Sequence, residues 1–150
     1  MLPDRTTGSA LFADISGFTV LTESLRKALG ARQGAEALSR QMEEVFSALV
    51  AEVEMYGGSV INFAGDSMLC WFDRGIHEIQ ASSSSALSAA MGMQNVMQTF
   101  SNLALKVSIA SGNSRRFVVG DETIQRMDVL AGVTVSRTAV GEQLATKGDI

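Results

Sequence analysis

The sequence predicts an α+β domain in which helices pack on a mostly antiparallel sheet. Three observations support this fold class. Short apolar runs bounded by glycine and polar residues are typical of strands, and they occur in both halves of the chain. Longer stretches carry apolar residues at helical spacing. Two of the strand-like runs are separated only by Gly65-Asp66, a two-residue turn typical of a hairpin. Hairpins combined with crossover helices favour a helix-on-sheet sandwich.

The first half of the chain is expected to form a strand, two helices and a hairpin. Residues 8–15 are an apolar run with turn signals on both sides, which predicts a buried strand. Apolar residues recur at helical spacing over 18–29 and 33–55, and the glycines that follow Tyr56 end the second helix. Residues 59–72 then read as the hairpin.

The second half is expected to add a helix, two or three strands and a final helix. The helix covers residues 76–100 and includes the run Ser82–Ser85, which we interpret as a weakly helical, solvated stretch. Strands at 103–110 and 117–119 flank a polar turn at 112–116. A short strand at 127–131 and a helix at 133–146 complete the order.

Size and composition predict one globular domain over residues 1–150. The chain has 150 residues, of which 46% are hydrophobic and 19% charged. It is therefore long and apolar enough to bury a hydrophobic core, and intrinsic disorder is excluded. A net charge of −4 is the wrong electrostatic footprint for general nucleic-acid binding. One cysteine and one histidine exclude a disulfide framework and a Cys/His zinc cluster. No apolar run approaches the roughly 18–20 residues of a membrane span, and we expect a cytoplasmic location.

Two carboxylates are expected to meet at one rim of the sheet. Strands joined by a helical crossover run in the same direction, so the strand ending near Asp14 and the strand before Asp66 end at the same edge. Such a pair repels unless one group is protonated or a cation lies between them, which suggests Mg²⁺ or Mn²⁺. A helix cap and a turn residue are the alternative roles, and the spacing alone leaves both interpretations open.

Four motifs resemble the catalytic domain of class III nucleotidyl cyclases. They are LFADISGFTVLTE (11–23), GGSVINFAGDSMLCW (57–71), KVSIASG (106–112) and VGDET (119–123). Within that family the chain is most similar to the first catalytic half (C1) of soluble, bicarbonate-responsive adenylyl cyclases and their bacterial relatives. The resemblance implies the class III cyclase fold with its ferredoxin-like core. It also implies conversion of ATP to 3′,5′-cyclic AMP and pyrophosphate in a dimer.

The resemblance assigns roles to particular residues. Asp14 and Asp66 match the aspartates that hold two Mg²⁺ or Mn²⁺ ions, and the carbonyl of Ile15 is a further ligand. One metal would lower the pKa of the ribose 3′-hydroxyl and the other would hold the β- and γ-phosphates. The groups expected to bind the triphosphate lie at the start of the first helix and on a later strand: Ser16, Gly17, Phe18, Thr19 and Lys106.

Three positions depart from the pattern of symmetric homodimeric cyclases. Ser136 stands where those enzymes carry a ribose-binding Asn, Val140 where they carry a transition-state Arg, and Asn62 where they carry a base-reading Lys. We expect Arg137 to point to another helix face. The pattern predicts a C1-like half that is weak or silent alone and is completed by a C2-type partner. Asn62 and Ala139 also replace the two cations of the bicarbonate site, so no bicarbonate activation by that route is expected.

Several alternatives remain open from sequence. The first is a guanylate cyclase half, the second a catalytically silent cyclase-like dimerisation or regulatory module, and the third a self-associating homodimer. The fourth is a different two-aspartate phosphotransferase, such as a diguanylate cyclase, although the chain has no GG(D/E)EF-type motif. Family members continue past the last helix with further strands, so we expect a truncated domain. We expect no site function for five kinds of residue: a buried Cys70, a surface His77, the core methionines 91, 93 and 97, the solvated turn pair Arg115-Arg116, and the turn residue Asp121.

Overall fold

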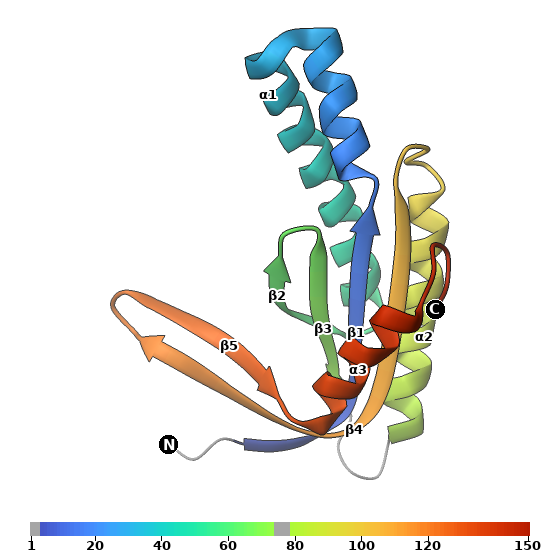
Figure 1. Ribbon diagram of the computed structural model, residues 1–150. Helices are drawn as coiled ribbons and strands as arrows, with labels where there is room; N and C mark the ends of the chain where they lie inside the picture. The colour runs from blue at the N-terminus through green and yellow to red at the C-terminus, as the bar shows by residue number, and fades with distance from the viewer. Residues whose placement is uncertain (1–3, 74–78) are drawn as a thin grey trace.

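The computed structural model describes residues 4–73 and 79–150, which form one five-stranded sheet with helices on both faces (Figure 1). None of the helices in these two ranges is long and apolar enough to cross a membrane. The elements in chain order are β1 (Asp4–Ser16), α1 (Phe18–Met55), β2 (Ser59–Ala64), β3 (Ser67–Asp73), α2 (Ile79–Met97), β4 (Ala104–Asp121), β5 (Gln125–Ala131) and α3 (Val133–Leu144).

The sheet has the order β2-β3-β1-β4-β5, and every neighbouring pair is antiparallel. This confirms the predicted α+β class with a mostly antiparallel sheet. Strand β1 is central, and its Asp14 lies opposite Ser67 of β3 on one side and Lys106 of β4 on the other. Because β3 is antiparallel to both β1 and β2, those two strands run in the same direction. Their ends therefore meet at one rim, as the sequence predicted.

Helix α1 is two helical arms joined at Gly30. This glycine has φ 81° and ψ 174°, a conformation that interrupts the helix and that L side chains rarely adopt. The chain rises through the first arm, turns at the top and descends through the second (Figure 1). The two arms correspond to the two helices expected at 18–29 and 33–55. A Cβ at Gly34 would lie 3.0 Å from the backbone of Leu25, so the close approach of the arms requires glycine there.

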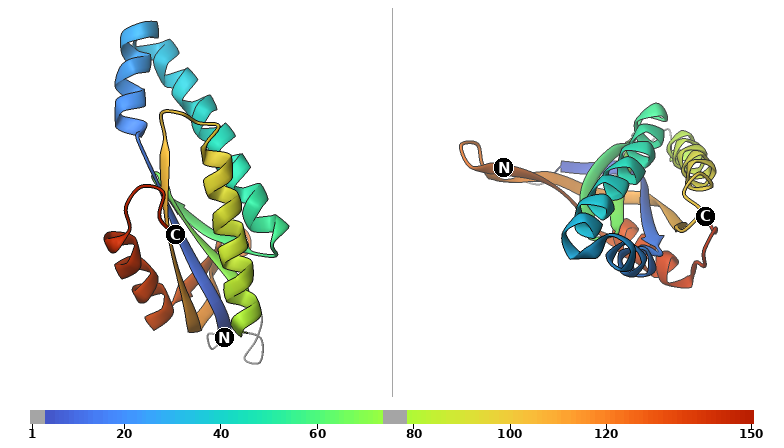
Figure 2. Two further views of the ribbon diagram at one scale, coloured as in Figure 1. Left: turned by 90° about the vertical axis from the view of Figure 1, so that its right-hand side faces the viewer. Right: turned by 90° about the horizontal axis from the view of Figure 1, so that it is seen from above.

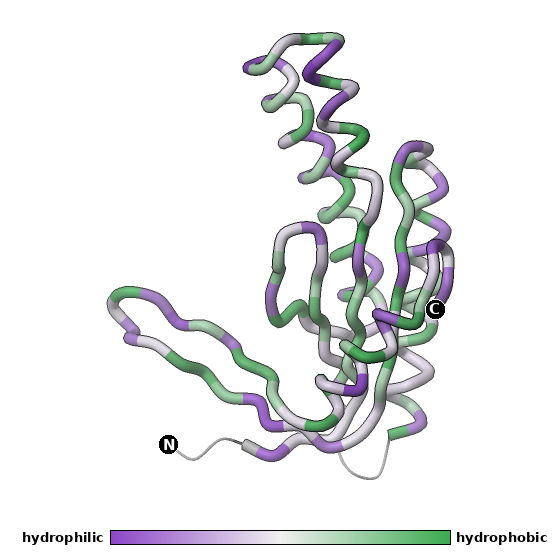
Figure 3. The backbone as a smooth tube through the Cα atoms, in the orientation of Figure 1, coloured by the Kyte–Doolittle hydropathy of each residue, from purple (hydrophilic) through white to green (hydrophobic). Residues whose placement is uncertain are grey.

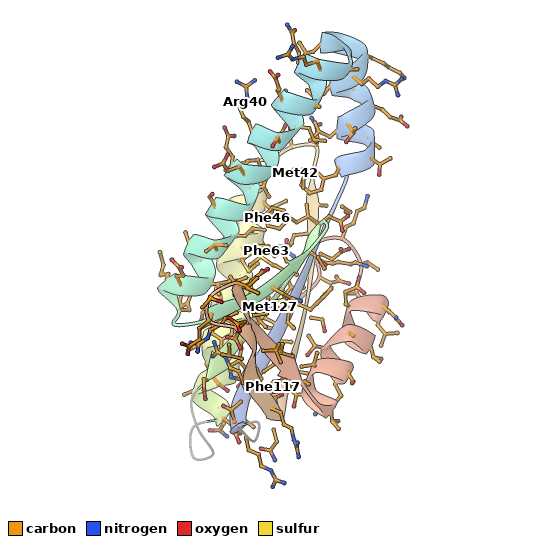
Figure 4. The ribbon with its side chains drawn as sticks, turned by 90° about the vertical axis from the view of Figure 1, so that its left-hand side faces the viewer. Arg40, Met42, Phe46, Phe63, Phe117 and Met127 are labelled. Carbon is orange, nitrogen blue, oxygen red and sulfur yellow. The ribbon has the colours of Figure 1, made fainter. Side chains whose placement is uncertain are left out.

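Helices α1 and α2 cover one face of the sheet, and α3 covers the other (Figure 2). The larger core lies on the α1/α2 face, where Val45, Leu49 and Val53 of the second arm are fully buried at the predicted helical spacing. A smaller core on the α3 face surrounds Trp71. Across the edge of the sheet, the ring of Phe46 packs edge-on against that of Phe63 at 5.3 Å (Figure 4).

Two local predictions in the second half were wrong. The polar segment 112–116 is not a turn, because β4 continues through it as one strand. Residues Asp4–Ser16 of β1 pair with it across the whole stretch from Ala104 to Arg116, and this partner outweighs the local polar pattern. Ser82 is not solvated either. Its hydroxyl is buried 2.9 Å from that of Ser9, which in turn lies 2.6 Å from that of Ser111, so the three serines satisfy one another between α2 and the sheet.

The residues expected to have no site role have mixed outcomes. Cys70 is fully buried, and burial raises the pKa of its thiol to about 12, which confirms a small core residue. Met93 and Met97 are in the core, whereas Met91 is 55% exposed, so the prediction for Met91 was wrong. His77 lies outside the described residues.

Candidate functional site

The two aspartates singled out from sequence come together at the rim where β1 and β2 end. The main-chain N–H of Ile15 donates a 2.9 Å hydrogen bond to the carbonyl of Asp66, which ties the end of β1 to the β2–β3 turn. In an extended strand the N–H and C=O of one residue point to the same side. The Ile15 carbonyl therefore faces the turn that carries Asp66, so two carboxylates and one main-chain oxygen converge there.

Asp14 lies in a negative environment. Its pKa is raised, first by burial of the carboxyl group and then by the nearby Asp66 carboxylate, with a smaller contribution from Glu142. Lys106 acts in the opposite direction but does not overcome the other effects. The side chain of Asp14 is 23% exposed, so the carboxylate is accessible. A bound cation would relieve the repulsion between these carboxylates, and hard oxygen donors suit Mg²⁺ or Mn²⁺.

At this rim the described residues offer the carboxylates of Asp14 and Asp66 and the Ile15 carbonyl as candidate metal ligands. In the ranges 4–73 and 79–150, no group of three or more His, Cys, Asp or Glu side chains is placed to hold a metal ion. Two carboxylates with open positions fit a Mg²⁺ site that keeps waters and substrate phosphates as its remaining ligands. The donor set therefore fits the ions expected from the resemblance.

Lys106 is held at the same rim by a residue that the sequence analysis missed. Its Nζ lies 3.7 Å from Asp14 Oδ2 and 2.5 Å from Oε1 of Glu142 on α3. The contact with Glu142 is the main reason that the pKa of Lys106 is raised. Glu142 lies nine residues past the start of α3, and only the packing of α3 on β4 brings it to Lys106. No local sequence signal marks this contact.

The residues expected to bind phosphate surround the start of α1. Gly17 has φ 107° and immediately precedes Phe18, the first residue of the helix. A Cβ at Gly17 would lie 2.4 Å from the carbonyl oxygen of Asn102, so only glycine fits there. Ser16 ends β1 and Thr19 is exposed in the first helical turn. The uncapped helix start presents free N–H groups, which favour anions.

Two of the three positions that depart from the homodimeric pattern lie on the outer side of α3, and the third lies on β2. Ser136 and Val140 line a shallow groove of about 460 Å³, and Val140 is 57% exposed. Arg137 lines the same groove, so the expectation that it faces elsewhere was wrong, although its guanidinium donates a long 3.5 Å hydrogen bond back to the Ser111 carbonyl. Asn62 is exposed on β2, where it lines a separate pocket of about 320 Å³.

The β4–β5 hairpin projects from the body as an arm with exposed apolar side chains. Figure 1 shows the projection, and Figure 3 shows hydrophobic stretches along it. Ile124 at the turn is 86% exposed, and Val118 and Met127 are 61% and 55% exposed. Figure 4 marks Phe117 and Met127 on the two strands. Asp121 accepts hydrogen bonds from the N–H and hydroxyl of Thr123, which confirms the predicted turn role.

Comparison with known proteins points to one family. The family described as "Adenylate and Guanylate cyclase catalytic domain" matches residues 5–150. Adenylate cyclase type 10 of Oryctolagus cuniculus is 29% identical over 98% of this chain, and the Homo sapiens protein of the same name is 27% identical over 98%. The chain spans 9% of the length of each of these relatives.

Solved structures share the fold. The adenylyl cyclase CyaB from P. aeruginosa has a TM-score of 0.82 at 21% identity, covering 99% of this chain and 76% of that one. The guanylate cyclase domain of RhGC from Catenaria anguillulae, solved in complex with GTP, has a TM-score of 0.77 at 19% identity, covering 97% and 77%. The predicted cyclase fold is therefore confirmed.

Proposed function

Because the chain belongs to the adenylate and guanylate cyclase catalytic domain family, we propose that it is the metal-holding half of a composite nucleotidyl cyclase site. In this proposal the completed site converts ATP to 3′,5′-cyclic AMP and pyrophosphate. The convergence of Asp14 and Asp66 beside the start of α1 carries the proposal, because two carboxylates next to free helix N–H groups suit a metal-bound triphosphate.

Asp14, Asp66 and the Ile15 carbonyl would hold two Mg²⁺ or Mn²⁺ ions. When bound, such ions lower the pKa of the ribose 3′-hydroxyl and neutralise the phosphate oxygens during in-line displacement. The raised pKa of Asp14 supports this assignment, since a cation would relieve the repulsion from Asp66. Asp66 is exposed and lies in a turn, so its carboxylate can adjust to the ions without breaking the sheet.

The triphosphate would lie across the start of α1, bound by the main-chain N–H groups that follow Gly17 and by the hydroxyls of Ser16 and Thr19. Lys106 would contact a phosphate from the β4 side. Glu142 acts as a positioning residue, because its carboxylate fixes the ammonium group beside Asp14 before substrate arrives. A fixed cation stabilises developing phosphate charge without reorganisation during the reaction.

The chain does not supply the donors that stabilise the transition state in symmetric family members. Val140 has no hydrogen-bond donor, and losing such a contact commonly costs about 10² to 10³ in rate. We therefore propose that a C2-type partner provides the ribose, base and transition-state groups. The exposed apolar side chains of the β4–β5 arm support dimerisation, because exposed apolar surface of this kind is typical of interaction sites.

ATP is favoured as substrate by the names of the two curated relatives reported above, which are adenylate cyclases. GTP is the second candidate, because structural neighbours include guanylate cyclase domains. A silent dimerisation module is the alternative function. It is favoured by Ser136 and Val140 alone, whereas both metal aspartates count against it.

The test is cyclic nucleotide production from Mn²⁺-ATP and Mn²⁺-GTP. The chain is assayed alone, mixed with a C2-type half from a characterised family member, and mixed with the same half as an Asp14→Asn variant. We expect silence alone and activity on mixing that Asp14→Asn abolishes. Comparable activity alone would refute the composite site. Failure in every mixture, with intact Mn²⁺-ATP binding, would favour the silent module.

A further inference from the structure

Helix α3 packs on β4 through polar groups. Its two buried residues, Thr134 and Thr138, are 3% and 1% exposed. Apolar packing is non-directional, whereas hydrogen bonds require defined distances and angles. The position of α3 along β4 is therefore set by a small number of defined contacts.

Three of these contacts follow one another in opposite order along the strand and the helix. They are the hydrogen bond from the Thr134 hydroxyl to the Asn113 carbonyl at 2.7 Å, the buried hydrogen bond from the Ser108 hydroxyl to the Thr138 carbonyl at 2.8 Å, and the ion pair between Lys106 and Glu142 at 2.5 Å. On the helix, successive contacts are four residues apart, which is about one turn. A slip of α3 along the strand would therefore break all three.

Gly141 allows α3 to lie close to β4 at the Ser108 contact. It is three residues after Thr138, and a Cβ at this position would overlap the Ser108 hydroxyl oxygen and lie 3.3 Å from the Ser108 Cβ. Glycine is unfavourable inside a helix compared with alanine, so a glycine there indicates a packing requirement. The Ser108 hydroxyl fills the space that a side chain at Gly141 would occupy.

The same contact determines where Glu142 lies. Glu142 follows Gly141 directly and is one helical turn after Thr138. Lys106 is two residues before Ser108, on the same face of β4. Two residues of a strand span roughly 6–7 Å and one helical turn about 5.4 Å, so both contacts can form at the same time. The lysine side chain is long and flexible, and a correctly placed carboxylate is needed to hold its ammonium group at the rim.

We propose that Ser108 and Gly141 are positioning residues for Lys106, which they place through α3 and Glu142. The inference rests on the proposed function, in which Lys106 contacts a phosphate of the substrate. The Ser108–Gly141 contact fixes the register of α3 on β4, and this register places the Glu142 carboxylate against the ammonium group. A group that is held in place before substrate arrives loses less freedom on binding, so the contact raises affinity for the triphosphate without touching it.

A zero-length crosslink measures the contact between Glu142 and Lys106 without metal, nucleotide or activity. A water-soluble carbodiimide condenses a carboxylate and an amine that touch into an amide, with loss of water, and mass spectrometry of the digested chain locates the bond. In the wild type we expect Lys106 to be joined mainly to Glu142, at 2.5 Å, and less to Asp14, at 3.7 Å. Gly141→Ala should shift this ratio towards Asp14 by about tenfold, the scale of an overpacked contact.

Removing the Ser108 oxygen should undo the effect of the added methyl group. Ser108→Ala alone loses one hydrogen bond and should lower the Glu142 crosslink about twofold. Ser108→Ala combined with Gly141→Ala should match Ser108→Ala alone, because the methyl group then takes the space of the hydroxyl. If Gly141→Ala does not fold, the twofold loss in Ser108→Ala becomes the deciding measurement.

Gly92→Ala is the matched control. This glycine also lies inside a helix, and a Cβ there would also meet a side-chain oxygen, that of Glu52. It belongs to α2, on the other face of the sheet from α3, so the crosslink of Lys106 should not change. An equal shift in Gly92→Ala would make the effect a general response to an altered helix and would overturn the inference.

Titration calorimetry with Mn²⁺-ATP tests the link to substrate. Gly141→Ala should weaken binding about tenfold, as Glu142→Gln does, and the double variant should bind no more weakly than Glu142→Gln, since both changes act on one contact. The inference is wrong if Gly141→Ala leaves the crosslink unchanged, if Ser108→Ala does not rescue it, or if its effect on binding adds fully to that of Glu142→Gln.

Lys106→Gln separates this inference from the proposed function. If Lys106→Gln binds Mn²⁺-ATP as the wild type does, the phosphate role of Lys106 is wrong, and the crosslink alone decides whether Ser108 and Gly141 position it. If Lys106→Gln binds weakly while Gly141→Ala binds normally, the proposed function stands and the positioning role is refuted.

Discussion

Replacing Asp14 by asparagine should stabilise the metal-free protein and abolish its response to Mn²⁺. The pKa of Asp14 is raised by burial and by Asp66, so the folded protein disfavours the ionised carboxylate at neutral pH. Asparagine has the same shape without the charge. The substitution also removes the ion pair between Asp14 and Lys106. This pair is weak, because its N–O distance is 3.7 Å, and Lys106 keeps its 2.5 Å contact with Glu142.

The expected gain is about 0.5–1 kcal/mol, a common size for relieving an unfavourable charge at a functional site. For a chain of 150 residues this corresponds to a rise in Tm of roughly 1–4 °C. In the wild type, Mn²⁺ at 100 times its Kd should add about 2.7 kcal/mol, or roughly 5–10 °C. In Asp14→Asn this metal-dependent rise should disappear.

Differential scanning calorimetry with and without Mn²⁺ measures both effects. Glu54→Gln is the matched control, because it removes an exposed carboxylate from the end of α1 and should change neither value. The reasoning is refuted if Asp14→Asn lowers the metal-free Tm while Mn²⁺ still raises it as in the wild type. That outcome would make Asp14 a structural residue of β1 and leave the metal elsewhere.

Three further predictions concern other parts of the molecule. Glu142→Gln should weaken Mn²⁺-ATP binding about tenfold by releasing Lys106, measured by titration calorimetry against Gln143→Ala as a control; unchanged affinity would contradict the positioning role. Because burial raises the pKa of Cys70 from 9.0 to about 12, the folded state keeps a neutral thiol that the unfolded state ionises. The free energy of unfolding should therefore fall by about 1.4 kcal/mol per pH unit from this group between pH 9 and 12, and urea titrations of Cys70→Ala should lack that slope. A double-mutant cycle on Phe46→Leu and Phe63→Leu should give a coupling of about 0.5–1.5 kcal/mol, and strict additivity would mean that their edge-on contact contributes nothing.

Much of the candidate site could be predicted from sequence because its parts are short, local motifs. Gly17 sits between a strand and a helix, and Asp66 sits in a two-residue turn, so local patterns locate both. The direction of β1 and β2 follows from the connecting helices. Glu142 could not be found in this way, because its distance from Lys106 depends on how α3 packs across β4.

The errors came where a distant partner outweighed a local pattern. Residues 112–116 are polar and contain glycine, which favours a turn, yet the long β1 strand extends them as part of β4. Ser82 belongs to a serine run typical of a solvated helix, yet Ser9 and Ser111 satisfy its hydroxyl inside the protein. Met91 is apolar like the two core methionines of α2, but it lies off the stripe of buried residues on that helix, and 55% of it is exposed.

The sequence by itself determined the class of fold, the order of the elements up to α2 and the rim at which Asp14 and Asp66 meet, because hydrophobic periodicity and turn chemistry act over a few residues. The tertiary structure alone decided which charges face each other. The contact of Glu142 with Lys106 and the opposition of Arg5 to Arg115 join residues 36 and 110 positions apart. Strand register and helix packing set such contacts, and both depend on the whole folded chain.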